Sequence, residues 1–228
     1  MSKHIVSSRF DAICFDCDST LTRIEGIDEL AKRAGCEAEI VALTSAAMEG
    51  HVPIDAVYAK RLDRVRPSHA DLEWLARRYV EELVPGVRET ITMLARLHKH
   101  VYVVSGGLLQ PVLALATALD IPSQNVCAVP VKFDEDGTYA GFDPNEPLTR
   151  PDGKALVCLE IAQRHGRVAL VGDGASDVAA RTAGAYIVGF GGVVARDAVR
   201  KTANVFIEGP SMMAVLDILL TDEERALG

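Results

Sequence analysis

The stretch Phe10-Asp11-Ala12-Ile13-Cys14-Phe15-Asp16-Cys17-Asp18-Ser19-Thr20 decides how this chain folds. Its apolar part ends in two carboxylates, Asp16 and Asp18, and then in hydroxyl side chains. Residues 13–15 have the composition of a buried strand. In open α/β sheets, functional groups lie at the carboxyl ends of the strands. The stretch therefore predicts a strand over about residues 10–16 that presents two acidic groups at a sheet edge.

Two further apolar runs also lead into polar clusters. Residues 101–104 precede Ser105-Gly106-Gly107, and residues 168–171 precede Gly172-Asp173-Gly174-Ala175-Ser176-Asp177. Helical patterns separate the strands, which predicts an α/β fold with a doubly wound, Rossmann-like parallel sheet. Because parallel strands end at the same edge, we expect the three polar clusters to lie together.

No strand-like run interrupts residues 25–84. Apolar residues recur there at helical spacing, first at Ile27, Leu30, Ala31 and Ala34. Gly35 is suited to end one helix and Ser68 to begin another. We therefore expect a small helical cap over residues 25–84, inserted into a core formed by residues 1–24 and 85–228.

The bulk composition limits the possible partners. The formal net charge is −8, from 24 basic and 32 acidic residues, which argues against nucleic acid or an anionic membrane as the main partner. No apolar run approaches the roughly 18 residues of a membrane span, and the amino terminus does not resemble a secretory signal. Cys14 and Cys17 form a CxxC pair without a second pair, so we expect free thiols and a reducing cytoplasm.

The polar clusters contain the groups that phosphoryl transfer requires. Asp16 can attack phosphorus and form an aspartyl-phosphate. Two like charges about 4 Å apart repel by roughly 4 kcal/mol at an effective dielectric constant of about 20, so a cation is needed. The carboxylates of Asp16 and Asp173, with the backbone carbonyl of Asp18, are suitable ligands for Mg²⁺.

The other polar residues have complementary roles in this interpretation. Asp18 acts as general acid and then as general base. Ser105-Gly106-Gly107 binds phosphoryl oxygens, and Lys154 supplies a positive charge to the phosphate and to Asp16. Asp177 and Ser176 support the metal indirectly, for example through a metal-bound water.

Together these residues resemble the motifs of the haloacid dehalogenase superfamily of phosphatases. The matching motifs are Asp16-Cys17-Asp18-Ser19-Thr20, Ser105, Lys154, and Gly172-Asp173-Gly174 with Asp177. Residues 25–31, Met48, Arg61 and Gly189-Phe190-Gly191-Gly192 further resemble the phosphoserine phosphatases of that superfamily. The resemblance implies Mg²⁺-dependent hydrolysis of O-phosphoserine to serine and phosphate, a reaction of serine biosynthesis.

The resemblance also implies which residues read the substrate. In this family a cap glutamate binds the substrate amine and a cap arginine binds its carboxylate; the matching residues are Glu25 and Arg61. Met48 matches a residue that packs on the substrate. Glu49 and Ile54 differ from the residues usual in the family near the expected pocket.

Other functions remain open at this point. One alternative is a broader small-molecule phosphatase, or a phosphotransferase that passes phosphate from Asp16 to another hydroxyl. A non-catalytic binding module is disfavoured, because Asp16, Asp18 and Asp173 are all present. The expected assembly is a monomer or a homodimer.

Overall fold

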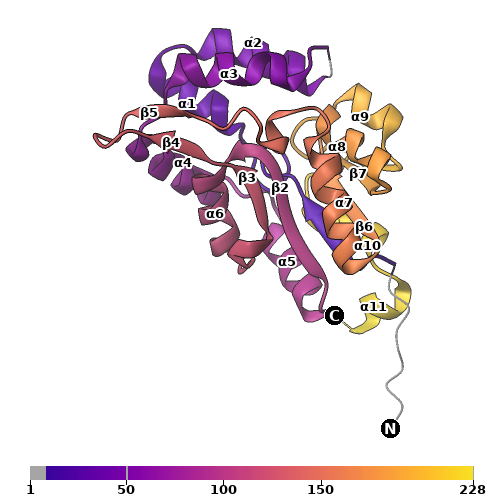
Figure 1. Ribbon diagram of the computed structural model, residues 1–228. Helices are drawn as coiled ribbons and strands as arrows, with labels where there is room; N and C mark the ends of the chain where they lie inside the picture. The colour runs from indigo at the N-terminus through magenta and orange to yellow at the C-terminus, as the bar shows by residue number, and fades with distance from the viewer. Residues whose placement is uncertain (1–8, 50, 228) are drawn as a thin grey trace.

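The computed structural model describes residues 9–49 and 51–227. Its centre is a six-stranded sheet in the order β3-β2-β1-β6-β7-β8, in which every pairing is parallel (Figure 1). The strands are β1 (Ala12–Phe15), β2 (His100–Leu108), β3 (Val126–Val129), β6 (Val168–Gly172), β7 (Tyr186–Phe190) and β8 (Val205–Ile207). This topology confirms the predicted α/β fold.

The strand order reverses at β1, which lies between β2 and β6. Ile13 pairs with Val101 on one side and with Ala169 on the other. The four residues of β1 are completely buried, since helices flank the sheet. These helices are α5 (Val87–Arg96), α6 (Leu109–Ala118), α7 (Gly153–His165), α8 (Ala175–Ala179), α9 (Asp197–Thr202), α10 (Leu216–Leu219) and α11 (Asp222–Leu227). A crevice at such a reversal point is the usual ligand site of an open α/β sheet.

Five helices lie between β1 and β2 in the chain, and we refer to the first four of them as the helical layer. They are α1 (Gly26–Ala34), α2 (Glu37–Met48), α3 (Ile54–Val65) and α4 (His69–Glu81). Gly35 ends α1 in the left-handed conformation, with φ of 70°. The Ser68 side chain accepts a hydrogen bond from the Asp71 amide, and the Asp71 side chain accepts one from the Ser68 amide. Both helix-end predictions are confirmed.

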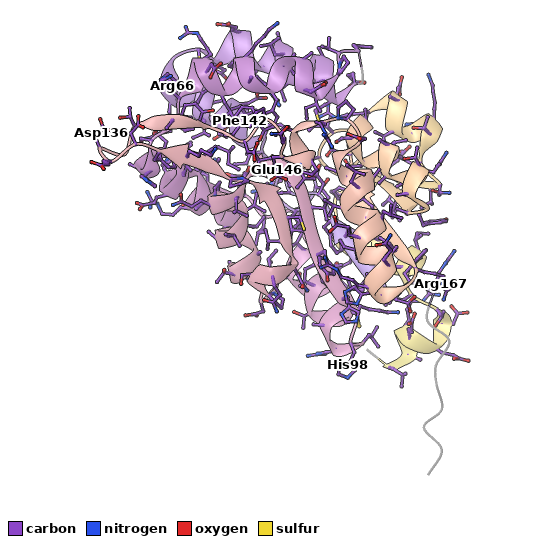
Figure 2. The ribbon with its side chains drawn as sticks, in the orientation of Figure 1. Arg66, His98, Asp136, Phe142, Glu146 and Arg167 are labelled. Atoms are coloured by element: carbon purple, nitrogen blue, oxygen red, sulfur yellow. The ribbon has the colours of Figure 1, made fainter. Side chains whose placement is uncertain are left out.

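A β-hairpin lies against the helical layer. It consists of β4 (Val131–Phe133) and β5 (Tyr139–Phe142), with Asp136 at its tip (Figure 2). The guanidinium of Arg66 donates to the Tyr139 carbonyl at 3.1 Å, and the His69 ring stacks on Phe133 at 3.8 Å. The hairpin therefore packs against the residues that link α3 and α4.

One detail of the sequence interpretation was wrong. Ser105-Gly106-Gly107 does not follow a strand but lies inside β2, which continues to Leu108. The pairing of β2 with β3 shifts between Val104 and Leu108, so these three residues form an irregularity in the strand, as glycines often do. His100 begins β2, and its ring stacks on that of His165 with centroids 3.8 Å apart.

The cysteines agree with the expectation of free thiols. All five lie in the described part of the chain without a disulfide, and Cys14 and Cys158 are buried. Within the described residues, no helix combines the length and the apolar character that crossing a membrane requires.

Candidate active site

The ends of three neighbouring strands meet at one pocket. Asp16 follows β1 and its amide donates to the Val171 carbonyl at 2.9 Å, so the ends of β1 and β6 lie side by side. Most of the residues predicted for the site line this pocket. Those near the sheet are Asp16, Asp18, Ser105, Gly106, Gly107, Lys154 and Ser176. Met48 and Arg61 belong to the helical layer, and Glu25 directly precedes α1. Asp173 and Asp177 are fully buried beside Asp16.

Three carboxylates form a compact cluster. Oxygens of Asp16, Asp173 and Asp177 all lie within 4.8 Å of one another. Lys154 Nζ lies 2.8 Å from Asp16 Oδ2 and 2.6 Å from Asp177 Oδ1. Arg196 Nε donates to Asp173 Oδ2 at 3.0 Å. Two cations do not balance three ionised carboxylates, and hard oxygen donors with excess negative charge suit Mg²⁺.

Burial dominates the protonation of this cluster. It raises the pKa of Asp173 to about 6, with a further contribution from Asp16, and that of Asp177 to about 7. Burial alone would lower the pKa of Lys154, but the carboxylates of Asp16 and Asp177 raise it above its usual range. Lys154 therefore remains charged at neutral pH, whereas the buried carboxyls resist ionisation.

Asp18 is held by the helical layer. Its Oδ1 accepts a 2.6 Å hydrogen bond from the Tyr79 hydroxyl and a 2.9 Å bond from the Gly26 amide. Burial raises the pKa of Asp18 to about 6, and the bond from Tyr79 opposes that rise. Its Oδ2 lies beside Gly107, where an added Cβ would be 3.1 Å away. Because Oδ1 of Asp18 already accepts two hydrogen bonds, Oδ2 is the oxygen better placed to exchange a proton in the pocket.

Glycines allow backbone to approach these carboxylates. The Gly107 amide donates to Ser105 Oγ at 3.0 Å, which keeps the segment tightly folded beside Asp18. A Cβ on Gly172 would lie 2.2 Å from Asp177 Cγ, so a larger residue at the end of β6 would displace that carboxylate.

Two ionisable side chains enter the pocket, Glu25 from the position before α1 and Arg61 from α3. Glu25 accepts a hydrogen bond from the Ser19 hydroxyl at 2.7 Å, and burial raises its pKa well above the usual range. Arg61 is 6% exposed, and its Nη1 donates to Thr44 Oγ1 at 3.2 Å. Its Nε has no hydrogen-bond partner among the described residues. Arg61 is therefore a buried cation with an unused donor.

Sequence reasoning missed four residues of this region. Tyr58, Tyr79 and Arg150 line the pocket, and Arg196 lies behind it. Tyr79 belongs to the apolar face of α4, and the pattern that reveals such a face does not show whether a hydroxyl reaches a carboxylate. Arg196 lies in a loop before α9 without any periodic signal.

Arg196 also provides a partner for Glu49, the acidic residue that differs from the residue usual in the family at this position. Its Nη1 lies 3.6 Å from Glu49 Oε1, and its Nη2 lies 3.5 Å from Glu25 Oε1. The additional carboxylate therefore faces a buried guanidinium of the core. Arg196 also contacts Asp173 and Glu25, so it offsets only part of the charge of Glu49.

Comparison with known proteins identifies the class. A model of haloacid dehalogenase-like hydrolases matches residues 10–184. The chain belongs to this family. Within it, the bovine phosphoserine phosphatase is 39% identical over 199 residues, which cover 86% of this chain and 88% of that protein. The chain is therefore a member of the phosphoserine phosphatase group.

Solved structures agree with this placement. A substrate-bound phosphoserine phosphatase complex superposes with a TM-score of 0.81 at 26% identity, covering 93% of this chain and all of that one. A phospho-aspartyl intermediate analogue of phosphoserine phosphatase superposes with a TM-score of 0.78 at 25% identity, covering 92% and 99%.

The carboxylate cluster predicts a pH-dependent effect of Mg²⁺ on stability. The raised pKa values of Asp173 and Asp177 favour the metal-free fold while these groups are protonated, and that contribution is lost as pH rises through about 6 to 7. Mg²⁺ requires the ionised carboxylates. At 100 times its Kd it should add about 2.7 kcal/mol of stability, or roughly 5–10 °C in Tm, at pH 8 and much less at pH 5.

Thermal unfolding with and without Mg²⁺ at both pH values measures this difference. Asp11→Asn, at the opposite end of β1, should retain the full effect, because Asp11 Oδ2 accepts a hydrogen bond from the Arg167 amide there, away from the carboxylate cluster. An equal Tm increment at pH 5 and pH 8 would contradict the prediction.

Proposed function

We propose that this chain hydrolyses O-phosphoserine through an aspartyl-phosphate formed on Asp16. The observation that carries the proposal is one pocket lined by both Asp16, beside Lys154, and Arg61, a buried cation with an unused donor. Phosphoserine has a phosphate, a carboxylate and an ammonium group. Arg61 is suited to the carboxylate and Glu25 to the ammonium, while the apolar side chain of Met48 packs on the carbon atoms.

In the first half-reaction, an Asp16 oxygen attacks phosphorus and the bond from phosphorus to the serine oxygen breaks. Asp18 donates its proton to that departing oxygen, a role favoured by its raised pKa of about 6. The charge of Lys154 and the donors of Ser105-Gly106-Gly107 stabilise the phosphoryl oxygens.

In the second half-reaction, water attacks the phosphorus of the aspartyl-phosphate. Asp18, now ionised, accepts a proton from that water, and the bond from Asp16 to phosphorus breaks. Phosphate is released and both aspartates return to their starting states.

Mg²⁺ would be held by Asp16, Asp173 and the backbone carbonyl of Asp18, and it supplies charge neutralisation for attack on an anionic phosphate. Asp177 and Ser176 would support it through a bound water. Arg196 and Lys154 already lie against this cluster, so the protein's own cations offset part of its charge in the absence of Mg²⁺.

We further propose that the helical layer is a cap that excludes water during the reaction. The boundaries of residues 25–84 for the cap and residues 1–24 and 85–228 for the core stay predictions. A cytoplasmic location and a monomeric or homodimeric assembly are also predictions, the former supported by the free cysteines.

Asp16→Asn should lower kcat by about a thousandfold or more, because an amide cannot form the acyl-phosphate. Phosphate release from phosphoserine measures the loss, and circular dichroism checks the fold. Asp11→Asn is the matched control, because Asp11 directly precedes β1 and Asp16 directly follows it. Substantial turnover by Asp16→Asn would exclude the covalent mechanism.

Arg61→Ala should lower kcat/KM for phosphoserine by about a hundredfold, since the substrate carboxylate loses its charged partner. The value for p-nitrophenyl phosphate, which has no carboxylate, should change little. Arg64→Ala is the control on the same helix, because Arg64 is exposed and its ion-pair partner among the described residues is the exposed Glu39, at 3.1 Å. Equal losses for both substrates would show that Arg61 does not read the carboxylate.

Tyr79→Phe should move the alkaline limb of the kcat/KM profile to higher pH by about one unit. The Tyr79 hydroxyl favours ionised Asp18, so its removal raises the pKa of Asp18 and keeps the general acid protonated to higher pH. Tyr102→Phe removes a hydroxyl that contacts His165 on α7, and should leave the profile in place. An unchanged or acid-shifted limb in Tyr79→Phe is the contrary result.

A further inference from the structure

Tyr58 connects the helical layer to Ser105-Gly106-Gly107, which we call the phosphate-binding segment because of its proposed role. It lies on α3 and is 4% exposed. Its hydroxyl donates a 2.9 Å hydrogen bond to the carbonyl oxygen of Gly106. Its ring packs edge-to-face against Phe142 of β5, with centroids 5.1 Å apart; Phe142 lies below α2 and α3 in Figure 2. Tyr58 therefore contacts two parts of the molecule that lie outside its own layer.

One face of α3 carries all the groups involved. Ile54, Tyr58 and Arg61 follow the i, i+4, i+7 spacing of one helix face, and all three line the pocket. Ile54 Cδ1 lies 3.9 Å from the position that a Cβ on Gly106 would occupy. The same face therefore approaches Gly106 at one end and presents Arg61 at the other.

The bond from Tyr58 has a consequence for the neighbouring amide. The Gly106 carbonyl and the Gly107 N–H belong to one peptide group, and the described residues contain no cis peptide bond. In a trans peptide these two groups point in opposite directions. Holding the carbonyl toward α3 therefore turns the Gly107 N–H away from α3, where it meets Ser105 Oγ. Between two glycines this peptide has little intrinsic preference to remain so oriented.

We propose that Tyr58 is a positioning residue that couples closure of the helical layer to the orientation of the Gly106–Gly107 peptide for phosphate binding. This inference rests on the proposed phosphatase function of the same pocket. The hydrogen bond joins α3 to β2, so it exists only while the layer lies against the sheet. Its effect extends to every phosphomonoester, because it acts on the phosphate end of the pocket. Arg61, one turn further along α3, acts only on substrates with a carboxylate.

The test compares two tyrosine hydroxyls. Tyr58→Phe removes the bond to Gly106 and keeps the ring against Phe142. Tyr139→Phe is the matched control, because Tyr139 is also buried but its hydroxyl has no hydrogen-bond partner among the described residues. Tyr58→Phe should lower kcat/KM for phosphoserine and for p-nitrophenyl phosphate by the same factor, about three- to tenfold. Tyr139→Phe should change neither by more than about twofold.

Two measurements without turnover complete the test. Inorganic phosphate carries no carboxylate or amine, so its Kd reports the phosphate-binding segment alone. In Tyr58→Phe this Kd should rise about three- to tenfold, and amide hydrogen exchange in residues 105–107 should accelerate. Both values should stay at the wild-type level in Tyr139→Phe.

The outcomes separate this inference from the proposed function. Wild-type phosphate affinity and exchange in Tyr58→Phe would overturn the role of Tyr58. A loss of kcat/KM confined to phosphoserine would also overturn the proposed role. It would indicate that Tyr58 acts by positioning the neighbouring Arg61, whose guanidinium lies 5.6 Å from the Tyr58 ring. If the wild-type protein does not hydrolyse phosphoserine, the proposed substrate is wrong, while phosphate binding and hydrogen exchange still decide the role of Tyr58.

Discussion

The buried ion cluster around Lys154 is the interaction on which the rest of the site depends. Lys154 Nζ lies between Asp16 and Asp177, at 2.8 and 2.6 Å, and all three residues are almost fully buried. Buried carboxylates at adjacent strand ends repel one another, and a paired cation is needed to keep them ionised. Removing one partner of such a cluster leaves an uncompensated charge, so the end of β1, the helix α8 and the start of α7 constrain one another.

The helical layer covers the pocket and also places polar side chains against its residues. Tyr79 reaches Asp18, Tyr58 reaches Gly106, and Arg61 presents a buried donor to the same pocket. Glu49 is paired with Arg196 across the boundary between the layer and the core. Because these contacts join the layer to the groups proposed to bind and transfer phosphate, opening the layer would alter the site's hydrogen bonds in addition to admitting water.

Local patterns predicted much of the fold correctly. The apolar runs before Asp16 and Asp173 are buried parallel strands, and Ser68 begins α4 with the expected capping interaction. The pattern failed at Ser105-Gly106-Gly107, because these glycines lie inside β2 and the irregularity depends on its pairing with β3. Pairing between strands is a tertiary property, so turn-like residues alone do not locate the end of a strand.

The sequence by itself determined the fold class and predicted the polar groups that the structure brings together at one pocket. The closeness of Asp16 to Asp18 and the apolar run before them follow from covalent order and strand burial. Only the tertiary structure decided that Tyr79 restrains Asp18, that Arg196 lies beside Glu49, and that Tyr58 meets Gly106. These partners lie 61, 147 and 48 positions apart in the chain. Contacts over such separations leave no periodic signal, because they arise where helices pack against the sheet edge.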